Sequence, residues 1–353
     1  MSEACFMSEK LLIQGQHYYT WSQSTSFGAS IHVSPSSQFL CAALSTLACT
    51  CYTSLGGSQH LDLVSQTATQ LALLTKIDDD VIDSLPFHQG HHVARDHIIQ
   101  QTRSYLAPTL SSIHTASAFY QDDRCQLAAA LGQNLRTLSS NSKRLRHILS
   151  WIDQGWEIQA QAVAILTAHP SLYTLQQVKH ISAQISGVWL LMITLVGTLP
   201  ADATRTLTLE EENAFFTWGE AIQIADALAD FKKDLYDKHM CTVPGRLLFQ
   251  HHGDAYIEWI DHNSLSMLYQ SLVTNQVDLA CLPAVDFYQS ASIPLHNLKE
   301  TAYLLQWIHG FLTWRYIHAM ESQRASDDEK FAPFIQDLSA DFTHYVQGIH
   351  NLL

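Results

Sequence analysis

Apolar positions along the chain recur at intervals of three and four residues, and almost no stretch alternates with a period of two. This spacing predicts α-helices, because three to four residues complete one helical turn. Breaks in the pattern fall at prolines such as Pro86, Pro170, Pro200 and Pro283. The sequence therefore predicts an all-α protein of roughly ten or more helices, among them the ranges 38–55, 64–84, 126–150, 155–168, 174–199, 213–237 and 296–322.

No internal repeat and no long linker interrupts this pattern, which favours a single all-helical domain over residues 1–353, with residues 1–35 as a segment that precedes the helical bundle. The run from Thr208 to Glu211 has the form of a capping box and predicts the start of a helix. The most apolar run, from Ile185 to Leu199, is too short and too interrupted to span a membrane. We expect it to form a buried helix, and we expect no transmembrane segment.

The composition narrows the class of protein and its partners. Hydrophobic residues make up 47% of the chain and charged residues 15%, which predicts a large folded core. The formal charge of −14 argues against nucleic acid as a partner, because binding to phosphates requires an excess of Lys and Arg. The seven cysteines are scattered without a CxxC pair, and the N-terminus lacks the form of a signal peptide, so a cytoplasmic location is expected. A metal ion could reverse the negative field locally for an anionic ligand.

The first acidic motif is IDDDVIDS, residues 77–84. Asp79 and Asp83 are four residues apart and share one face of a helix, with Asp80 beside them. Such like charges destabilise a bare helix, whereas Mg²⁺ prefers carboxylate oxygens. A solvated acidic helix end explains this motif alone equally well. Asp78 falls on a different face and is expected to be dispensable.

The second acidic motif places Asp226, Asp230 and Asp234 at positions i, i+4 and i+8 within the segment 222–238. The residues around the first two are apolar, and three carboxylates that face a core would each cost several kcal/mol without compensation. A charged surface stripe is the alternative, and it fits the lysine-rich end of the segment. Two aspartate-rich helices in one all-helical chain favour a trinuclear Mg²⁺ site that grips a diphosphate.

Four segments resemble the class I isoprenoid (terpene) synthase superfamily. IDDDVIDS resembles the first aspartate-rich motif, and LTKIDDDVID is similar to the matching segment of squalene and phytoene synthases. ISAQISGVWLLMITLVG (181–197) resembles the helix of those enzymes that carries an Ala-Gly-x-Val-Gly break. IQIADALAD is similar to the second motif of chain-elongating prenyl diphosphate synthases, and the full D-xxx-D-xxx-D run to that of tetraprenyl-β-curcumene synthases. WIHGFLTWRY (307–316) ends in an Arg-Tyr pair similar to that of bacterial and fungal terpene cyclases.

The resemblance implies a class I terpenoid synthase bundle around a central active-site cavity with three Mg²⁺ ions. Its metal ligands would be Asp79, Asp80, Asp83, Asp226, Asp230 and Asp234. Catalytic roles would fall to Asp79, Asp83, Asp230, Arg315 and Tyr316. The diphosphate would receive hydrogen bonds from Arg315, Lys76, Lys233, Lys238 and Arg246. The substrate would lie against Gly187, Trp189, Phe215 and Trp307, with Phe87, Phe216, Trp218, Trp314 and Tyr316 as further lining candidates.

Simpler explanations exist for several of these residues. Aromatic side chains at helical spacing usually pack in a core, and Arg315 could pair with a structural carboxylate. Gly187 lies within a predicted helix, where glycine costs about 1 kcal/mol relative to alanine, so close approach of a ligand is one reason for it. The histidines show no HExxH-type spacing, and no metal role is assigned to them.

The implied activity is that of a lyase, a Mg²⁺-dependent terpene cyclase of isoprenoid secondary metabolism that converts farnesyl diphosphate to a cyclic sesquiterpene. The segment KHMCTVP (238–244) departs from the GR-x-Y-x-P segment of phytoene synthases, and basic residues for a second diphosphate are not evident. These departures favour a cyclase over a prenyltransferase or a head-to-head synthase. A non-catalytic interaction subunit is the third hypothesis. The expected partner is a prenyl diphosphate, and a homodimer is one option for assembly.

Overall fold

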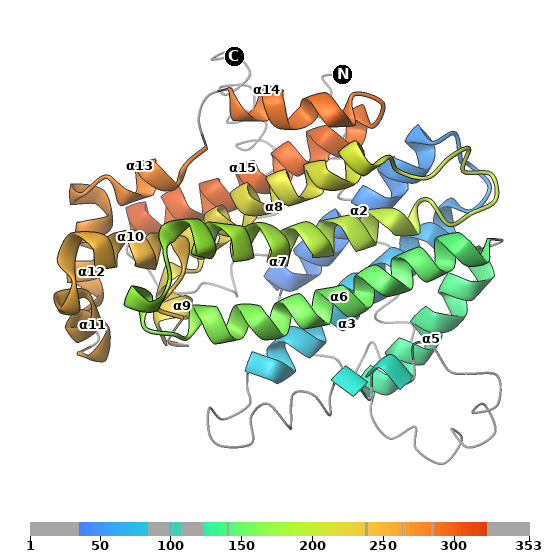
Figure 1. Ribbon diagram of the computed structural model, residues 1–353. Helices are drawn as coiled ribbons and strands as arrows, with labels where there is room; N and C mark the ends of the chain where they lie inside the picture. The colour runs from blue at the N-terminus through green and yellow to red at the C-terminus, as the bar shows by residue number, and fades with distance from the viewer. Residues whose placement is uncertain are drawn as a thin grey trace. The chain divides into compact units, whose positions relative to one another are not determined.

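The computed structural model describes residues 35–83, 99–100, 102–104, 106, 123–139, 141–236, 239–262, 264–283 and 286–322. This part of the chain forms thirteen α-helices and two short 3-10 helices and contains no strand, which confirms the predicted all-α class (Figure 1). The described residues divide into two compact units. The first holds residues 35–153 and 192–207, and the second holds residues 154–191 and 208–322. The expected terpenoid synthase bundle with a central cavity stays a prediction.

The first unit is built on α2 (Pro35–Ser54), α3 (Leu61–Asp83) and α5 (Asp123–Leu138). α3 packs against both α2 and α5, and its apolar face is buried between them. The beginning of α6 (Ser142–Leu166) and the end of α7 (Leu175–Val196) also belong to this unit. The apolar stripe of α3, which the sequence spacing predicts, is therefore buried between two neighbouring helices.

Asp202 fastens the loop that follows α7 to the turn between α2 and α3. The Tyr52 hydroxyl donates a hydrogen bond to its carboxylate at 2.6 Å, and the backbone N–H groups of Ser58 and Gln59 donate at 3.0 and 3.1 Å. Burial opposes ionisation, but these hydrogen bonds outweigh it and lower the pKa of Asp202 to about 2. The carboxylate is therefore charged at neutral pH and holds three chain segments together.

The second unit carries the remaining helices. They are η2 (Pro170–Leu172), α8 (Leu209–Ala229), α9 (Phe231–Tyr236), α10 (Val243–His252), α11 (Asp254–Asp261), α12 (Leu265–Thr274), α13 (Val277–Cys281), α14 (Phe287–Ser292), η3 (Ile293–Leu295) and α15 (Lys299–Ser322). α15 runs beside α8, and the short helices α10 to α13 pack on one another (Figure 1). Leu228, Leu248, Tyr256 and Leu268 belong to the core that joins α8 to these short helices.

The predicted capping box at the start of α8 is confirmed. The Thr208 N–H donates to the Glu211 carboxylate at 2.8 Å, and the Glu211 N–H donates to the Thr208 hydroxyl at 3.2 Å. Glu211 is buried, so its charge is satisfied by this reciprocal pair and by the positive end of the helix.

Other helix boundaries differ from those predicted. The single helix expected over 126–150 is wrong, because the chain breaks between α5 and α6. Here the Ser139 hydroxyl donates to the Asn141 carbonyl, and the Lys143 N–H donates to the Asn141 side chain at 2.9 Å. These polar side chains bind backbone groups that a continuous helix would use. Conversely, α6 runs through Gly155 to Leu166 without the expected break.

α7 and α8 cross in close backbone contact at two glycines. A Cβ atom on Gly219 would lie 2.6 Å from the Gly187 Cα and 2.7 Å from the Ala183 carbonyl oxygen. A Cβ atom on Gly187 would lie 2.8 Å from the Phe216 Cα. Glycine at both positions is therefore explained by the approach of two helices.

α7 contains most of the expected buried apolar run, from Ile185 to Val196, and begins ten residues before it at Leu175. It is the one helix in the described ranges that is long and apolar enough to cross a membrane. However, 61% of its most apolar window is buried inside the structure. Core helices of globular proteins meet the same criteria of length and composition, so this is weak evidence for a membrane span.

His309 on α15 lies in the core of the second unit, where 1% of its surface is exposed. Its Nδ1 is 2.8 Å from the Tyr288 hydroxyl of α14. Burial lowers the pKa of His309 to about 4. In the unfolded chain the pKa of His309 is near 6.5, so the unfolded state takes up a proton at a higher pH than the folded state does. The contribution of neutral His309 to stability is therefore fully present above pH 6.5 and is lost as the pH falls from 6.5 to 4.

We expect this single group to remove about 3 kcal/mol of stability between pH 6.5 and pH 4. Replacement of His309 by glutamine, which keeps a partner for Tyr288, should flatten that part of the pH profile. Urea denaturation at pH 7, 5.5 and 4.5 measures the difference. Parallel profiles for the variant and the wild type would show that His309 does not contribute to acid sensitivity.

Candidate functional site

Three carboxylates, Asp226, Asp230 and Asp234, form the second acidic motif, which we call the aspartate row. Asp226 lies in the last turn of α8, Asp230 is its C-terminal cap and Asp234 belongs to α9. The Asp230 N–H donates to the Asp226 carbonyl at 2.8 Å, and the Asp234 N–H donates to the Asp230 carbonyl at 2.9 Å. These i to i−4 bonds continue across the boundary between the helices, so the three residues remain about one turn apart.

Arg315 reaches the middle of the aspartate row from α15. Its Nη2 donates a hydrogen bond to Asp230 Oδ1 at 2.8 Å, and each side chain is 29% exposed. The sequence predicted both residues for one site, and the structure brings them into contact. The guanidinium also lies where incoming anions could compete for it, since neither partner is fully buried.

Asp234 is more enclosed than Asp230, with 19% of its side chain exposed against 29%. Burial raises the pKa of Asp234 to about 6. His239, 3.8 Å away, and Lys233 act in the opposite direction, while Asp230 adds to the rise. The ionised carboxyl is therefore incompletely compensated, and an added cation would favour it.

Tyr269 interacts with the row through Asp230, and Tyr316, next to Arg315 in the chain, binds a fourth carboxylate. The Tyr316 hydroxyl donates to Asp278 on α13 at 3.2 Å, and burial together with Asp278 raises the pKa of Tyr316. Burial and the charge of Asp230 raise the pKa of Tyr269 on α12. Sequence reasoning missed Asp278, Tyr269 and His239, because they lie in short helices and loops without a distinctive motif. Tyr316, predicted to be catalytic, is 5% exposed and fastens α13 to α15.

The first acidic motif lies in the last turn of α3, in the first unit. The side chains of Asp79, Asp80 and Asp83 lie outside the described part of the structure. Asp78 is described, and 1% of it is exposed. It forms an ion pair with Arg124 of α5 at 3.3 Å. This buried ion pair argues against the expectation that Asp78 is dispensable, because removal of one partner from such a pair is strongly destabilising.

The other predicted diphosphate donors have varied surroundings. Arg246 donates to the Tyr173 carbonyl at 2.7 Å and lies over the Phe249 ring, so it secures the turn after η2. Lys233 is exposed on α9, and Lys76 is half-buried on α3. Lys238 lies outside the described residues. Their contact with a diphosphate stays a prediction.

The predicted aromatic lining residues that the structure describes are packed. Phe215 is fully buried, and Trp307 stacks on Phe311 with ring centroids 5.8 Å apart. Trp218 donates from its indole N–H to the Ala291 carbonyl at 3.2 Å. Trp189 is half-buried against a small core of Ala162, Ile181 and Ile185. Phe87 and the side chain of Trp314 lie outside the described residues. Gly187 has the packing role described above.

Oxygen donors of the aspartate row suit Mg²⁺, which usually takes one or two protein carboxylates and completes its shell with water and substrate phosphates. Within the described ranges, no three His, Cys, Asp or Glu side chains gather around one point. The chemistry of the donor set fits Mg²⁺.

The sequence matches no protein-family model. It also matches no curated protein. The function is therefore inferred from the residues and their geometry.

Proposed function

We propose that this chain is a Mg²⁺-dependent class I terpene cyclase that acts on a single allylic prenyl diphosphate, with farnesyl diphosphate as the first candidate. The contact between Arg315 and Asp230 carries the proposal. An all-α chain places an arginine against the middle carboxylate of a row spaced by one helical turn. This combination of cationic donor and oxygen ligands suits a magnesium diphosphate.

In the proposed reaction the allylic C–O bond breaks, and the electron pair leaves with the diphosphate. The resulting cation closes a ring by forming a new C–C bond from a C=C bond of the same chain, and it then loses a proton to the released diphosphate. Arg315 exchanges its hydrogen bond with Asp230 for hydrogen bonds to phosphate oxygens, which stabilise the departing charge. Bound Mg²⁺ would supply further neutralisation of that charge.

The aspartate row would hold Mg²⁺ in the second unit. Asp79, Asp80 and Asp83 of α3 stay the further metal ligands that the resemblance implies. The raised pKa of Asp234, about 6, supports a cation at the row, because a carboxyl so placed gains from a positive neighbour. Aromatic side chains would shield the cation from water.

A product assay tests the proposal. The protein is incubated with Mg²⁺ and geranyl, farnesyl or geranylgeranyl diphosphate, each with and without isopentenyl diphosphate, and extracts are analysed by gas and liquid chromatography with mass spectrometry. We expect a cyclic hydrocarbon from one allylic diphosphate alone and none in the presence of EDTA. A longer prenyl diphosphate as product would indicate a prenyltransferase instead of a cyclase. A dimeric hydrocarbon would indicate a head-to-head synthase. Absence of any product would favour a non-catalytic subunit.

A further inference from the structure

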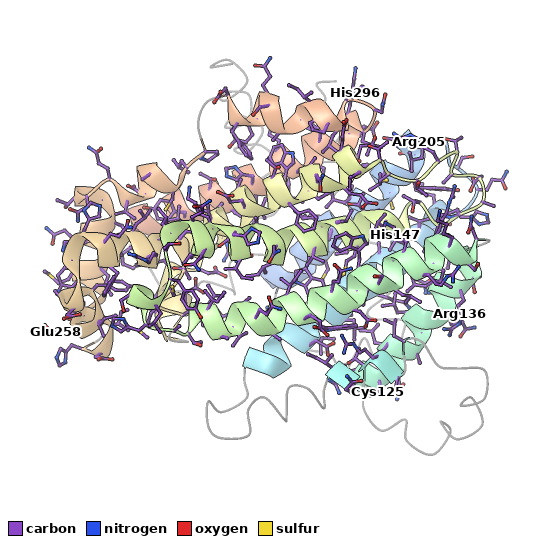
Figure 2. All side chains as sticks on the ribbon, viewed as in Figure 1. Cys125, Arg136, His147, Arg205, Glu258 and His296 are labelled. Atoms are coloured by element: carbon purple, nitrogen blue, oxygen red, sulfur yellow. The ribbon has the colours of Figure 1, made fainter. Side chains whose placement is uncertain are left out.

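The buried ion pair between Asp78 and Arg124 lies at the end of α3 that carries the first acidic motif. Asp78 Oδ1 is 3.3 Å from Arg124 Nη1, and the two side chains are 2% and 7% exposed. The Thr102 hydroxyl approaches the same carboxylate oxygen at 3.5 Å. Arg124 lies in the first turn of α5, next to Cys125, which is labelled in Figure 2.

A second polar contact joins the same two helices two turns earlier on α3. The Asn134 side chain donates to Gln70 at 2.9 Å, and Gln70 is 3% exposed. Positions rise along α3 from Gln70 to Asp78 while their partners fall along α5 from Asn134 to Arg124, so the helices pack antiparallel. Together the two contacts fix the register of α3 against α5, and the Asp78 contact fixes the rotation of the end of α3 that carries the acidic motif.

Rotation of α3 matters because residues 78 and 79 are adjacent in its last turn. Successive helical residues are about 100° apart, so positions 79 and 83 share a face that differs from that of position 78. Because the ion pair fixes the orientation of position 78 against α5, it also fixes the directions of the neighbouring positions of the same helix. A hydrophobic residue at position 78 would pack against α5 without a directional hydrogen bond. Buried ion pairs in general stabilise a protein no more than hydrophobic residues of similar size, so the direction that this pair imposes is what sets it apart.

We propose that Asp78 and Arg124 are positioning residues, which set the rotation of the end of α3 that carries positions 79, 80 and 83, the metal ligands assigned to this helix under the proposed function. This inference rests on the proposed function, because it assigns a task to the first acidic motif. Neither residue touches the substrate. Their effect acts through the geometry of the metal ligands, where supporting hydrogen bonds commonly change metal affinity by about 10–100-fold.

The test uses Arg124→Gln, the conservative variant Arg124→Lys and the matched control Gln70→Leu, which breaks the other polar contact between α3 and α5. The Mg²⁺ concentration that gives half-maximal turnover is measured with farnesyl diphosphate. We expect a rise of about tenfold or more in Arg124→Gln, a smaller rise in Arg124→Lys and a change within about twofold in Gln70→Leu. An unchanged Mg²⁺ requirement in folded Arg124→Gln overturns the proposal, as does an equal rise in Gln70→Leu.

Arg124→Gln leaves Asp78 buried without its cation and could fail to fold. The double variant Asp78→Leu with Arg124→Met removes both charges and keeps an apolar contact. We expect it to fold and to need about tenfold more Mg²⁺ than the wild type. A wild-type Mg²⁺ requirement in this variant overturns the proposal.

A binding measurement separates this inference from the proposed function. Calorimetric titration of Mg²⁺ with inorganic diphosphate into the full chain requires no turnover. If the wild type forms no terpene but binds magnesium diphosphate more tightly than the double variant by about tenfold, the cyclase fails and the positioning role stands. Equal affinity in the two proteins, or no binding by either, overturns the positioning role.

Discussion

Replacement of Asp230 by asparagine is expected to lower kcat/KM for the prenyl diphosphate by on the order of 10²–10³-fold. The variant removes the middle oxygen ligand of the aspartate row and the partner that orients Arg315. Its fold should survive, because both side chains are 29% exposed and such a pair contributes at most about 1 kcal/mol. Initial rates with product detection by gas chromatography measure the loss, and circular dichroism checks the fold.

Glu220→Gln is the matched control for Asp230→Asn. Glu220 also lies on α8 and pairs with Lys179 at 3.8 Å, with 40% of its side chain exposed. The change removes the same charge from the same helix outside the aspartate row. We expect kcat/KM within about twofold of the wild type, as for other exposed ion pairs. Equal losses in both variants would assign the effect to net charge, and an active Asp230→Asn would remove Asp230 from the metal site.

Replacement of Gly219 by alanine is expected to lower the free energy of unfolding by about 1–3 kcal/mol, and valine should have a larger effect. Alanine gains about 1 kcal/mol of helix propensity over glycine, which works against the loss. The new Cβ would, however, meet the Gly187 backbone, and a backbone cannot move aside as a flexible side chain does. α7 and α8 must then separate, which also strains the 2.6 Å hydrogen bond from Ser186 to Gln223.

Urea denaturation measures this loss, with Thr217→Ala as the control on the exposed face of α8. The control should lie within about 0.5 kcal/mol of the wild type. A Gly219→Ala variant as stable as the wild type would show that the helices can part without cost. Close approach of a ligand would then again be one explanation for glycine at position 187.

Sequence periodicity was sufficient for the fold class and for long helices such as α3, α7 and α15, because each buries a continuous apolar stripe. It was insufficient where local hydrogen bonds decide the outcome. Ser139 and Asn141 end one helix and begin the next through side-chain bonds to the backbone, which apolar spacing does not reveal. The helices α10 to α14 are five to ten residues long, and their amphipathic pattern covers too few turns to stand out.

The candidate site was predictable where its residues follow helical spacing. The aspartate row and Arg315 were both identified from sequence, but their contact depends on how α15 packs against α8, and this is a tertiary property. Asp78 shows the limit of pattern reasoning. Its place within an acidic run suggested an expendable charge, whereas its partner Arg124 lies 46 positions away in the chain.

Titration calorimetry with Mg²⁺ and inorganic diphosphate tests most directly whether the aspartate row and Arg315 form a magnesium diphosphate site. We expect binding to the wild type and to Glu220→Gln that requires both ions together. We expect binding to Asp230→Asn and to an Arg315→Met variant to be weaker by about tenfold or more. Equal affinity in all four proteins, or binding of diphosphate that is indifferent to Mg²⁺, would contradict the proposed site.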